Sequence, residues 1–140
     1  MVSGCNKFAT IVESLRRATM IYTGYYAKLK EYESKGLTPV SIAGKCPEFY
    51  KGIQYKKFAP SWDIFSKWKS GEIDNFQYTT RFQKEVLDRL DKLEVKEFLD
   101  SFKNDIILLC YEKSGEFCHR HIVADWIENS FGYRVEEFTL

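Results

Sequence analysis

The sequence predicts an α/β fold: one three-layer domain over residues 1–140, with a small, mostly parallel sheet flanked by helices. Two observations predict it. Short β-prone runs alternate with helical patterns along the chain, which is typical of parallel strands joined by helices. The run from Ile106 to Tyr111 is apolar throughout, as expected for a strand that is covered on both faces. A chain of 140 residues can also bury a hydrophobic core without disulfide or metal support.

The first elements follow from apolar spacing and from the residues that end helices. Phe8, Ile11 and Leu15 recur at helical spacing. A glycine directly after a basic residue, as in Lys35-Gly36, is a common helix end. The expected elements are a helix over 6–18, a strand over 20–23 ending at Gly24, a helix over 27–35 and a strand over 39–42.

Residues 44–60 show no periodicity and predict a long loop, and long ordered loops are often functional. Ser61 can then cap a helix over 62–69. Trp62, Phe65 and Trp68, at three-residue spacing, would share one face of that helix.

The remaining helices have clear start signals. Asp74-x-x-Gln77 and Asp91-x-x-Glu94 both resemble capping boxes. After the first box, apolar residues recur at four-residue spacing as far as Leu90. The expected elements are helices after each box, a strand over 105–111, a helix over 118–130 that stops near Gly132 and a last short strand over 133–138.

Composition limits the classes of function. The net charge of +1 argues against nucleic acid or an acidic membrane as partner, although the loop after Gly44 is locally rich in lysine. The aromatic fraction of 16% favours a core built from large rings over a base-stacking surface. No run is long enough to span a bilayer, and no signal peptide is recognisable. Four cysteines without a C-x-x-C pair predict reduced thiols in a cytoplasmic protein.

Ligands of such folds bind beyond the carboxyl ends of the strands. The ends of three expected strands are therefore candidate parts of a ligand site. The helix that begins near Cys118 starts at the same edge of the sheet. A helix N-terminus offers free backbone N–H groups and the positive end of a dipole. Arg120 in the first turn opposes that dipole, so a bound anion would explain it. The strand-end residues are Thr23, Gly24 and Tyr25, then Ala43, Gly44 and Lys45, then Cys110, Tyr111 and Glu112.

Helical geometry assigns directions to the residues of the run Cys118-His119-Arg120-His121. His119 lies on the apolar stripe and would face the strand ends, whereas His121 would face solvent. His119 is either a catalytic group or a buried imidazole bonded to a carbonyl. Cys118 is either an activated thiolate or a small buried residue. Cys110, inside an apolar strand, is expected to be structural.

Two known motifs do not fit. A cysteine-dependent phosphatase needs an arginine six residues after its cysteine, and the residue six positions after Cys110 is Glu116. Zinc could be bound by the two cysteines Cys110 and Cys118 with both histidines. That site would require His119 and His121 to converge from opposite sides of a helix, so neither a metal nor another cofactor is expected.

Several segments resemble the domain of unknown function 488 family over roughly residues 20–130. The pairing of Cys-x-Glu-Lys with Cys-His-Arg is the most specific part of this resemblance. It implies a compact α/β domain of bacteria, archaea and their phages, without a settled activity. Many members resemble each other in an Asp-x-Arg after the second strand, where this chain has Ser41-Ile42-Ala43-Gly44. The similar segments are 21–25, 47–50, 55–57, 59–62, 108–113 and 117–121.

The leading hypothesis is a pocket for a small phosphorylated or nucleotide-like ligand near Cys118-His119-Arg120. Turnover, if it occurs, would use Cys118 as nucleophile or His119 as general acid/base, with Glu112 orienting the histidine. The alternative is a non-enzymatic sequestering or sensing module, or a redox sensor that pairs Cys110 with Cys118. The oligomeric state stays open. The expected ligand-binding residues are Arg120, Thr23, Gly24, Tyr25, Lys45, Lys56 and Lys57, with Tyr25, Tyr50 or Trp62 stacking on a ring.

Overall fold

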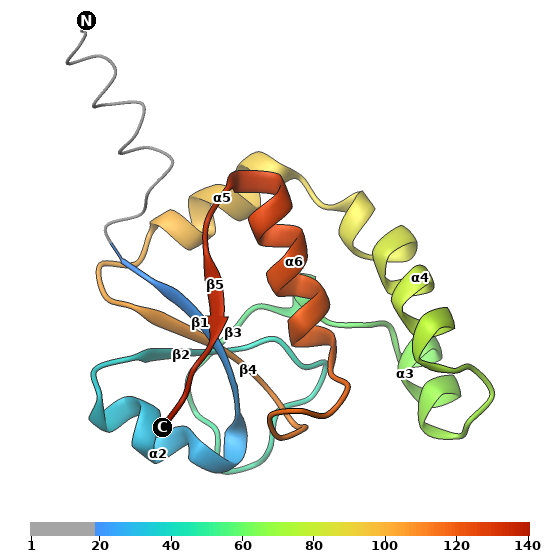
Figure 1. The fold of residues 1–140 in the computed structure, drawn as a ribbon, viewed down its shortest axis with the longest axis horizontal. Helices are drawn as coiled ribbons and strands as arrows, with labels where there is room; N and C mark the ends of the chain where they lie inside the picture. The colour runs from blue at the N-terminus through green and yellow to red at the C-terminus, as the bar shows by residue number, and fades with distance from the viewer. Residues whose placement is uncertain (1–18) are drawn as a thin grey trace, which may run out of the picture.

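The computed structural model describes residues 19–140, so the helix expected over 6–18 lies outside the described residues. A five-stranded sheet forms the centre of the fold, in the order β3-β2-β4-β1-β5 (Figure 1). Every strand pair in it is parallel, which confirms the predicted α/β class. The strands are β1 (Ile21–Tyr25), β2 (Thr38–Ser41), β3 (Ile53–Gln54), β4 (Ile106–Cys110) and β5 (Val135–Glu137).

Most helices begin at the predicted caps. The side chain of Ser61 accepts a hydrogen bond from the backbone of Ile64, and Asp74 with Gln77 forms a complete capping box. Gly132, at φ 73°, ends the last helix in the left-handed conformation that glycine adopts readily. The helices are α2 (Leu29–Ser34), α3 (Trp62–Lys69), α4 (Asn75–Glu85), α5 (Lys92–Asp100) and α6 (His119–Phe131), with 3₁₀ turns at Tyr26–Lys28, Lys56–Phe58 and Leu87–Arg89.

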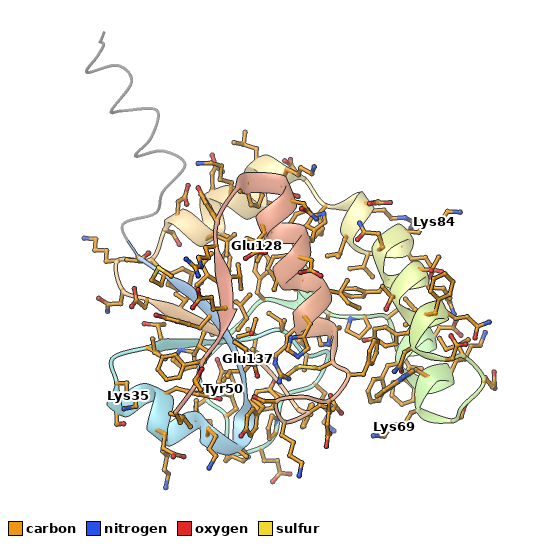
Figure 2. The ribbon with its side chains drawn as sticks, in the orientation of Figure 1. Lys35, Tyr50, Lys69, Lys84, Glu128 and Glu137 are labelled. Atoms are coloured by element: carbon orange, nitrogen blue, oxygen red, sulfur yellow. A yellow bond between two sulfur atoms is a disulfide. The ribbon has the colours of Figure 1, made fainter. Side chains whose placement is uncertain are left out.

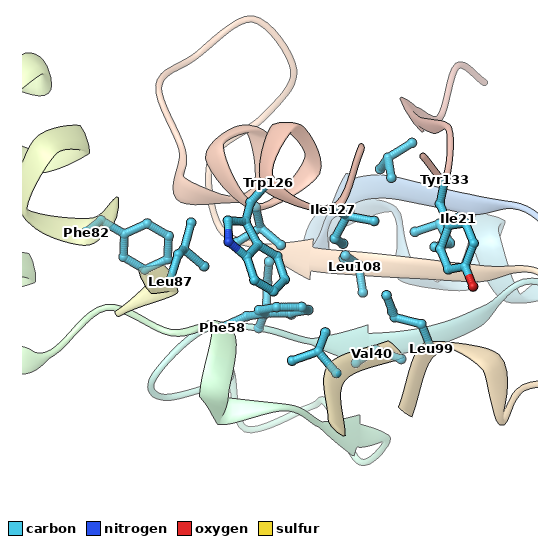
Figure 3. Packing of buried hydrophobic residues seen from close by; sticks show 14 of the residues in the cluster. Ile21, Val40, Phe58, Phe82, Leu87, Leu99, Leu108, Trp126, Ile127 and Tyr133 are labelled. Atoms are coloured by element: carbon cyan, nitrogen blue, oxygen red, sulfur yellow. The ribbon is translucent and has the colours of Figure 1, made fainter. Parts of the chain in front are cut away.

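The predicted central strand, β4, separates two hydrophobic clusters. Ile106 and Leu108 point into one cluster, and Ile107 and Leu109 point into the other. All four side chains are fully buried, as the continuous apolar run predicted. The first cluster contains residues of α4, α5 and α6, whereas α2 covers the opposite face of the sheet (Figures 1 and 3).

The structure corrects two element predictions. The expected loop over 44–60 contains the edge strand β3 and a 3₁₀ turn, and it buries Tyr50 and Phe58. The helix expected to continue to Leu90 ends at Glu85, because Leu90 adopts an extended backbone (ψ 144°) before the next helix cap. Between Thr19 and Leu140, none of the helices has the length and apolar character needed to cross a membrane.

Candidate functional site

A cavity of about 650 Å³ lies at the carboxyl ends of β2 and β4, the edge at which the sequence places a ligand. Residues that follow β2 and β4 form one wall, and α3 forms another. The N-terminal end of α6 contributes Cys118 and His119 to the lining. The full lining is Ala43, Gly44, Lys45, Pro60, Ser61, Trp62, Phe65, Trp68, Lys69, Tyr78, Cys110, Tyr111, Glu112, Phe117, Cys118 and His119.

Aromatic rings from α3 make up much of the wall. Trp62, Phe65 and Trp68 share one face of this helix, as their spacing predicted, with successive ring centroids 6.0 and 6.3 Å apart. Trp68 also packs against Phe117 at 5.5 Å. Trp62 remains 76% exposed, far more than a ring in a hydrophobic core. This side chain therefore has a free face beside the cavity.

Two lysines and one carboxylate are the charged side chains of the lining. Lys45 follows β2, and Lys69 is the last residue of α3 (Figure 2). Glu112 follows β4 and is half-buried. Within residues 19–140, neither lysine forms an ion pair, so both ammonium groups are available to an anion.

His119 faces inward, as predicted. Its Nε2 lies 2.7 Å from the carbonyl oxygen of Ile42, which matches the interpretation as a buried, carbonyl-bonded imidazole. Burial lowers the pKa of His119 to about 4, so the ring is neutral at neutral pH. Glu112, predicted to orient His119, forms no hydrogen bond with it, and the group that contacts the imidazole is the Ile42 carbonyl. His121 is half-buried, less exposed than expected.

The sulfur atoms of Cys110 and Cys118 are joined in a disulfide, and Cys46 is a free, half-buried cysteine. The structure therefore pairs the two cysteines that the redox-sensor alternative named, in place of the expected reduced thiols. Cys110, Cys118 and His119 also bring their ligand atoms within 4.8 Å of one another, without His121. This set of three does not require His119 and His121 to converge from opposite sides of the helix.

Arg120 has a structural role, contrary to the prediction that it meets an anion. Its side chain is fully buried, and Nε and Nη2 donate to the carboxylate of Glu137 at 3.0 and 2.8 Å. Its Nη1 donates to the backbone carbonyl of Glu112 at 2.6 Å and to the sulfur of Cys110 at 3.3 Å. The carboxylate partner of Arg120 is therefore Glu137, whereas Glu112 contributes only its backbone carbonyl. The guanidinium has no free face for a ligand.

The other predicted ligand residues lie away from the cavity lining. Thr23 donates to Glu137 at 2.5 Å, and the Tyr25 ring lies 5.9 Å from the Arg120 guanidinium. A side chain at Gly24 would collide with Tyr32, which gives this glycine a packing role.

The lysines after β3 and the ring of Tyr50 also lie outside the lining. Lys57 forms an ion pair with Glu94 at 2.5 Å, and Lys56 belongs to the same short 3₁₀ turn. Tyr50 is buried and donates to backbone carbonyls. Of the predicted ligand-binding lysines, the cavity includes Lys45 alone.

Several lining residues were not predicted as ligand contacts. Phe65, Trp68 and Lys69 could have been found, since they share α3 with Trp62 and the aromatic stripe was visible in the sequence. Tyr78 and Phe117 come from segments distant in sequence, and no local pattern marks them.

The fold and the cavity define a parallel-sheet α/β protein with a cavity at the carboxyl edge of its strands. The family model described as the active DUF488-N3 subclade (DUF488-N3a) matches residues 34–131. The chain therefore belongs to the DUF488 family, as the Cys-His-Arg resemblance predicted. No curated protein and no solved structure matches the chain.

Proposed function

We propose that this protein binds a small molecule with a flat ring and an anionic group, such as a nucleotide, in the cavity beside α3. The observation that supports it best is the combination of an aromatic wall with two lysines free of ion pairs in one cavity. Its volume of about 650 Å³ lies within the roughly 300–1,000 Å³ typical of small-molecule sites.

The ring of the ligand would stack on α3. Trp62 has a largely exposed ring, and Trp68 has its Nε1–H already bonded to Asn75 at 2.7 Å. That bond fixes the Trp68 indole and leaves stacking, not hydrogen bonding, as its contribution. Flat apolar surfaces of this kind accept many ring systems, because every base has a π-face.

The anionic group would bind between Lys45 and Lys69. An ammonium group without a carboxylate partner gains most from an incoming phosphate or carboxylate. Arg120 takes no direct part in this binding, since Glu137 and Glu112 already occupy its donors. Its role is to hold the segment after β4 against α6, which shapes the floor of the cavity.

After reduction of the Cys110–Cys118 disulfide, the same site would also have groups for turnover. Cys118, His119 and Glu112 all belong to the lining, and the matched subclade is described as active. Because its pKa is about 4, His119 is not protonated to the imidazolium form at neutral pH. The ring therefore lacks the acidic proton that the general-acid role requires.

Replacing Trp62 with alanine should weaken nucleotide binding by about 5- to 150-fold, since stacking one base on an aromatic ring contributes about 1–3 kcal/mol. The measurement is calorimetric titration of the full chain with a panel of nucleoside monophosphates. Phe76→Ala is the matched control, because Phe76 is 78% exposed on α4 and lies outside the cavity lining. This control should bind like the wild type.

Two further titrations separate the parts of the ligand. The affinity for a nucleoside without phosphate should not change when Lys45 or Lys69 is substituted. The affinity for ribose 5-phosphate should not change when Trp62 is substituted. If no nucleoside monophosphate binds, or if Phe76→Ala weakens binding as much as Trp62→Ala, the proposal is wrong.

The bond between Cys110 and Cys118 favours a second function, redox sensing. In that case two thiols and one hydrogen peroxide would give the disulfide and two waters. The reduced protein exposed to peroxide should lose two hydrogens in mass, with Cys110 and Cys118 linked in its peptides. Sulfenic acid on Cys46 without that link would contradict this function.

A further inference from the structure

Three metal-ligand groups meet at the floor of the cavity. Cys110 ends β4, Cys118 is the cap of α6 and His119 is the first residue of that helix. Their ligand atoms all lie within 4.8 Å of one another, and all three residues are buried. Each also belongs to the cavity lining. One strand end and one helix start therefore bring two sulfurs and a nitrogen to one point beside an open space.

The imidazole of His119 is held as metal-binding histidines are. Its Nε2 lies 2.7 Å from the Ile42 carbonyl, which can accept the ring proton. A backbone carbonyl that accepts from one ring nitrogen fixes the tautomer and leaves the other nitrogen as a ligand. Within residues 19–140, Nδ1 of His119 has no hydrogen-bond partner.

When the disulfide is reduced, Cys110 and Cys118 become two thiol groups at the same point of the cavity floor. Arg120 also donates a hydrogen bond to the Cys110 sulfur at 3.3 Å, which fixes the position of this sulfur at the end of β4. Nitrogen and sulfur ligands of this kind select zinc over magnesium or calcium.

We propose that the reduced protein binds one Zn²⁺ through Cys110, Cys118 and His119, with the fourth coordination position open to the cavity. Three protein ligands with one open position are typical of catalytic zinc, whereas structural zinc has four. Binding releases the two thiol protons, and the Cys110–Cys118 disulfide excludes the metal because both use the same sulfur atoms. The site does not depend on the nucleotide proposal, since its ligands all come from the protein.

The test uses the metal alone, on the full chain after reduction and removal of metal by a chelator. We expect one equivalent of Zn²⁺ to bind and Co²⁺ in its place to give a thiolate-to-cobalt charge-transfer band. Cys110→Ser and Cys118→Ser should each lose or greatly weaken that band. The matched controls, Cys46→Ser and His121→Ala, should keep it, because neither residue belongs to the set of three.

A second measurement on the wild-type chain covers the case in which the cysteine variants fail to fold. Zn²⁺ should slow alkylation of Cys110 and Cys118 at least tenfold and leave the rate at Cys46 unchanged, as mapped by peptide mass spectrometry. The proposal is overturned if the reduced wild type gives no thiolate-to-cobalt band, or if Zn²⁺ protects Cys46 and not this pair. Neither readout involves a nucleotide, so failure here is distinct from failure of the proposed function.

Discussion

Replacing Arg120 with alanine is expected to lower the free energy of unfolding by about 3 kcal/mol, the lower end of the usual cost of removing one partner of a buried ion pair. The Arg120 side chain is fully buried, and that of Glu137 is 26% exposed. The variant leaves the Glu137 carboxylate without its cation and the Glu112 carbonyl without its donor. Urea unfolding followed by circular dichroism measures the loss.

Arg134→Ala is the matched control, because Arg134 pairs with Glu136 on the surface with 76% of its side chain exposed. That variant should change stability by less than about 1 kcal/mol. If Arg120→Ala is as stable as the wild type and has lost only an anion-dependent stabilisation, Arg120 binds a ligand and the structural account is wrong.

The loss in free energy of unfolding caused by Arg120→Ala should also depend on pH. Burial opposes ionisation of Glu137, but hydrogen bonds from Arg120, Ser114 and Thr23 outweigh it and lower its pKa. A lowered carboxyl pKa contributes stability above the ordinary glutamate range, and that contribution is lost as pH falls through the folded-state pKa. The difference between Arg120→Ala and the wild type should therefore shrink on acidification.

Phe58→Ala is expected to cost about 3–5 kcal/mol, the usual effect of deleting a buried phenylalanine. Phe58 is fully buried, and its ring lies below Trp126 with centroids 6.0 Å apart (Figure 3). The substitution leaves a cavity between the segment before α3 and the centre of α6. The midpoint and slope of urea unfolding give the loss directly.

Phe49→Ala provides the comparison within the same connecting segment. Phe49 is 59% exposed, so its removal should cost less than about 1 kcal/mol. Equal effects of the two substitutions would mean that the segment is not anchored in the core by Phe58.

Local signals predicted the elements well. The Ser61 cap, the Asp74 capping box and the Gly132 end are determined by neighbouring residues, and all three are confirmed. The buried strand β4 was also predictable, because a continuous apolar run needs cover on both faces. Asp91 caps α5 as expected, although Glu94 pairs with Lys57 instead of completing a second capping box.

Partners distant in sequence were not predictable from one chain. Arg120 and Glu137 are 17 residues apart and meet only because β5 pairs with β1 beside α6. The burial of Phe58 likewise depends on α6, far along the chain. The edge strand β3 has two residues, too few for an alternating pattern.

The location of the candidate site followed from topology, but its composition did not. Parallel strands end at a common edge, so the neighbourhood of Lys45, Glu112 and Cys118 was predictable. The part of that edge that holds the cavity was not predictable, because it depends on where α3 packs. The prediction consequently included Thr23 to Tyr25 near β5 and missed the α3 wall beyond Trp62.

The most direct test of the proposed nucleotide site uses the indole N–H signals of the three tryptophans in a nuclear magnetic resonance titration. Trp62 and Trp68 line the cavity, whereas Trp126 is 7% exposed in the core. On addition of a nucleoside monophosphate, the Trp62 and Trp68 signals should shift together with one saturating curve, and the Trp126 signal should stay in place. Three unmoved signals at saturating ligand, or a shift confined to Trp126, would contradict a ligand site beside α3.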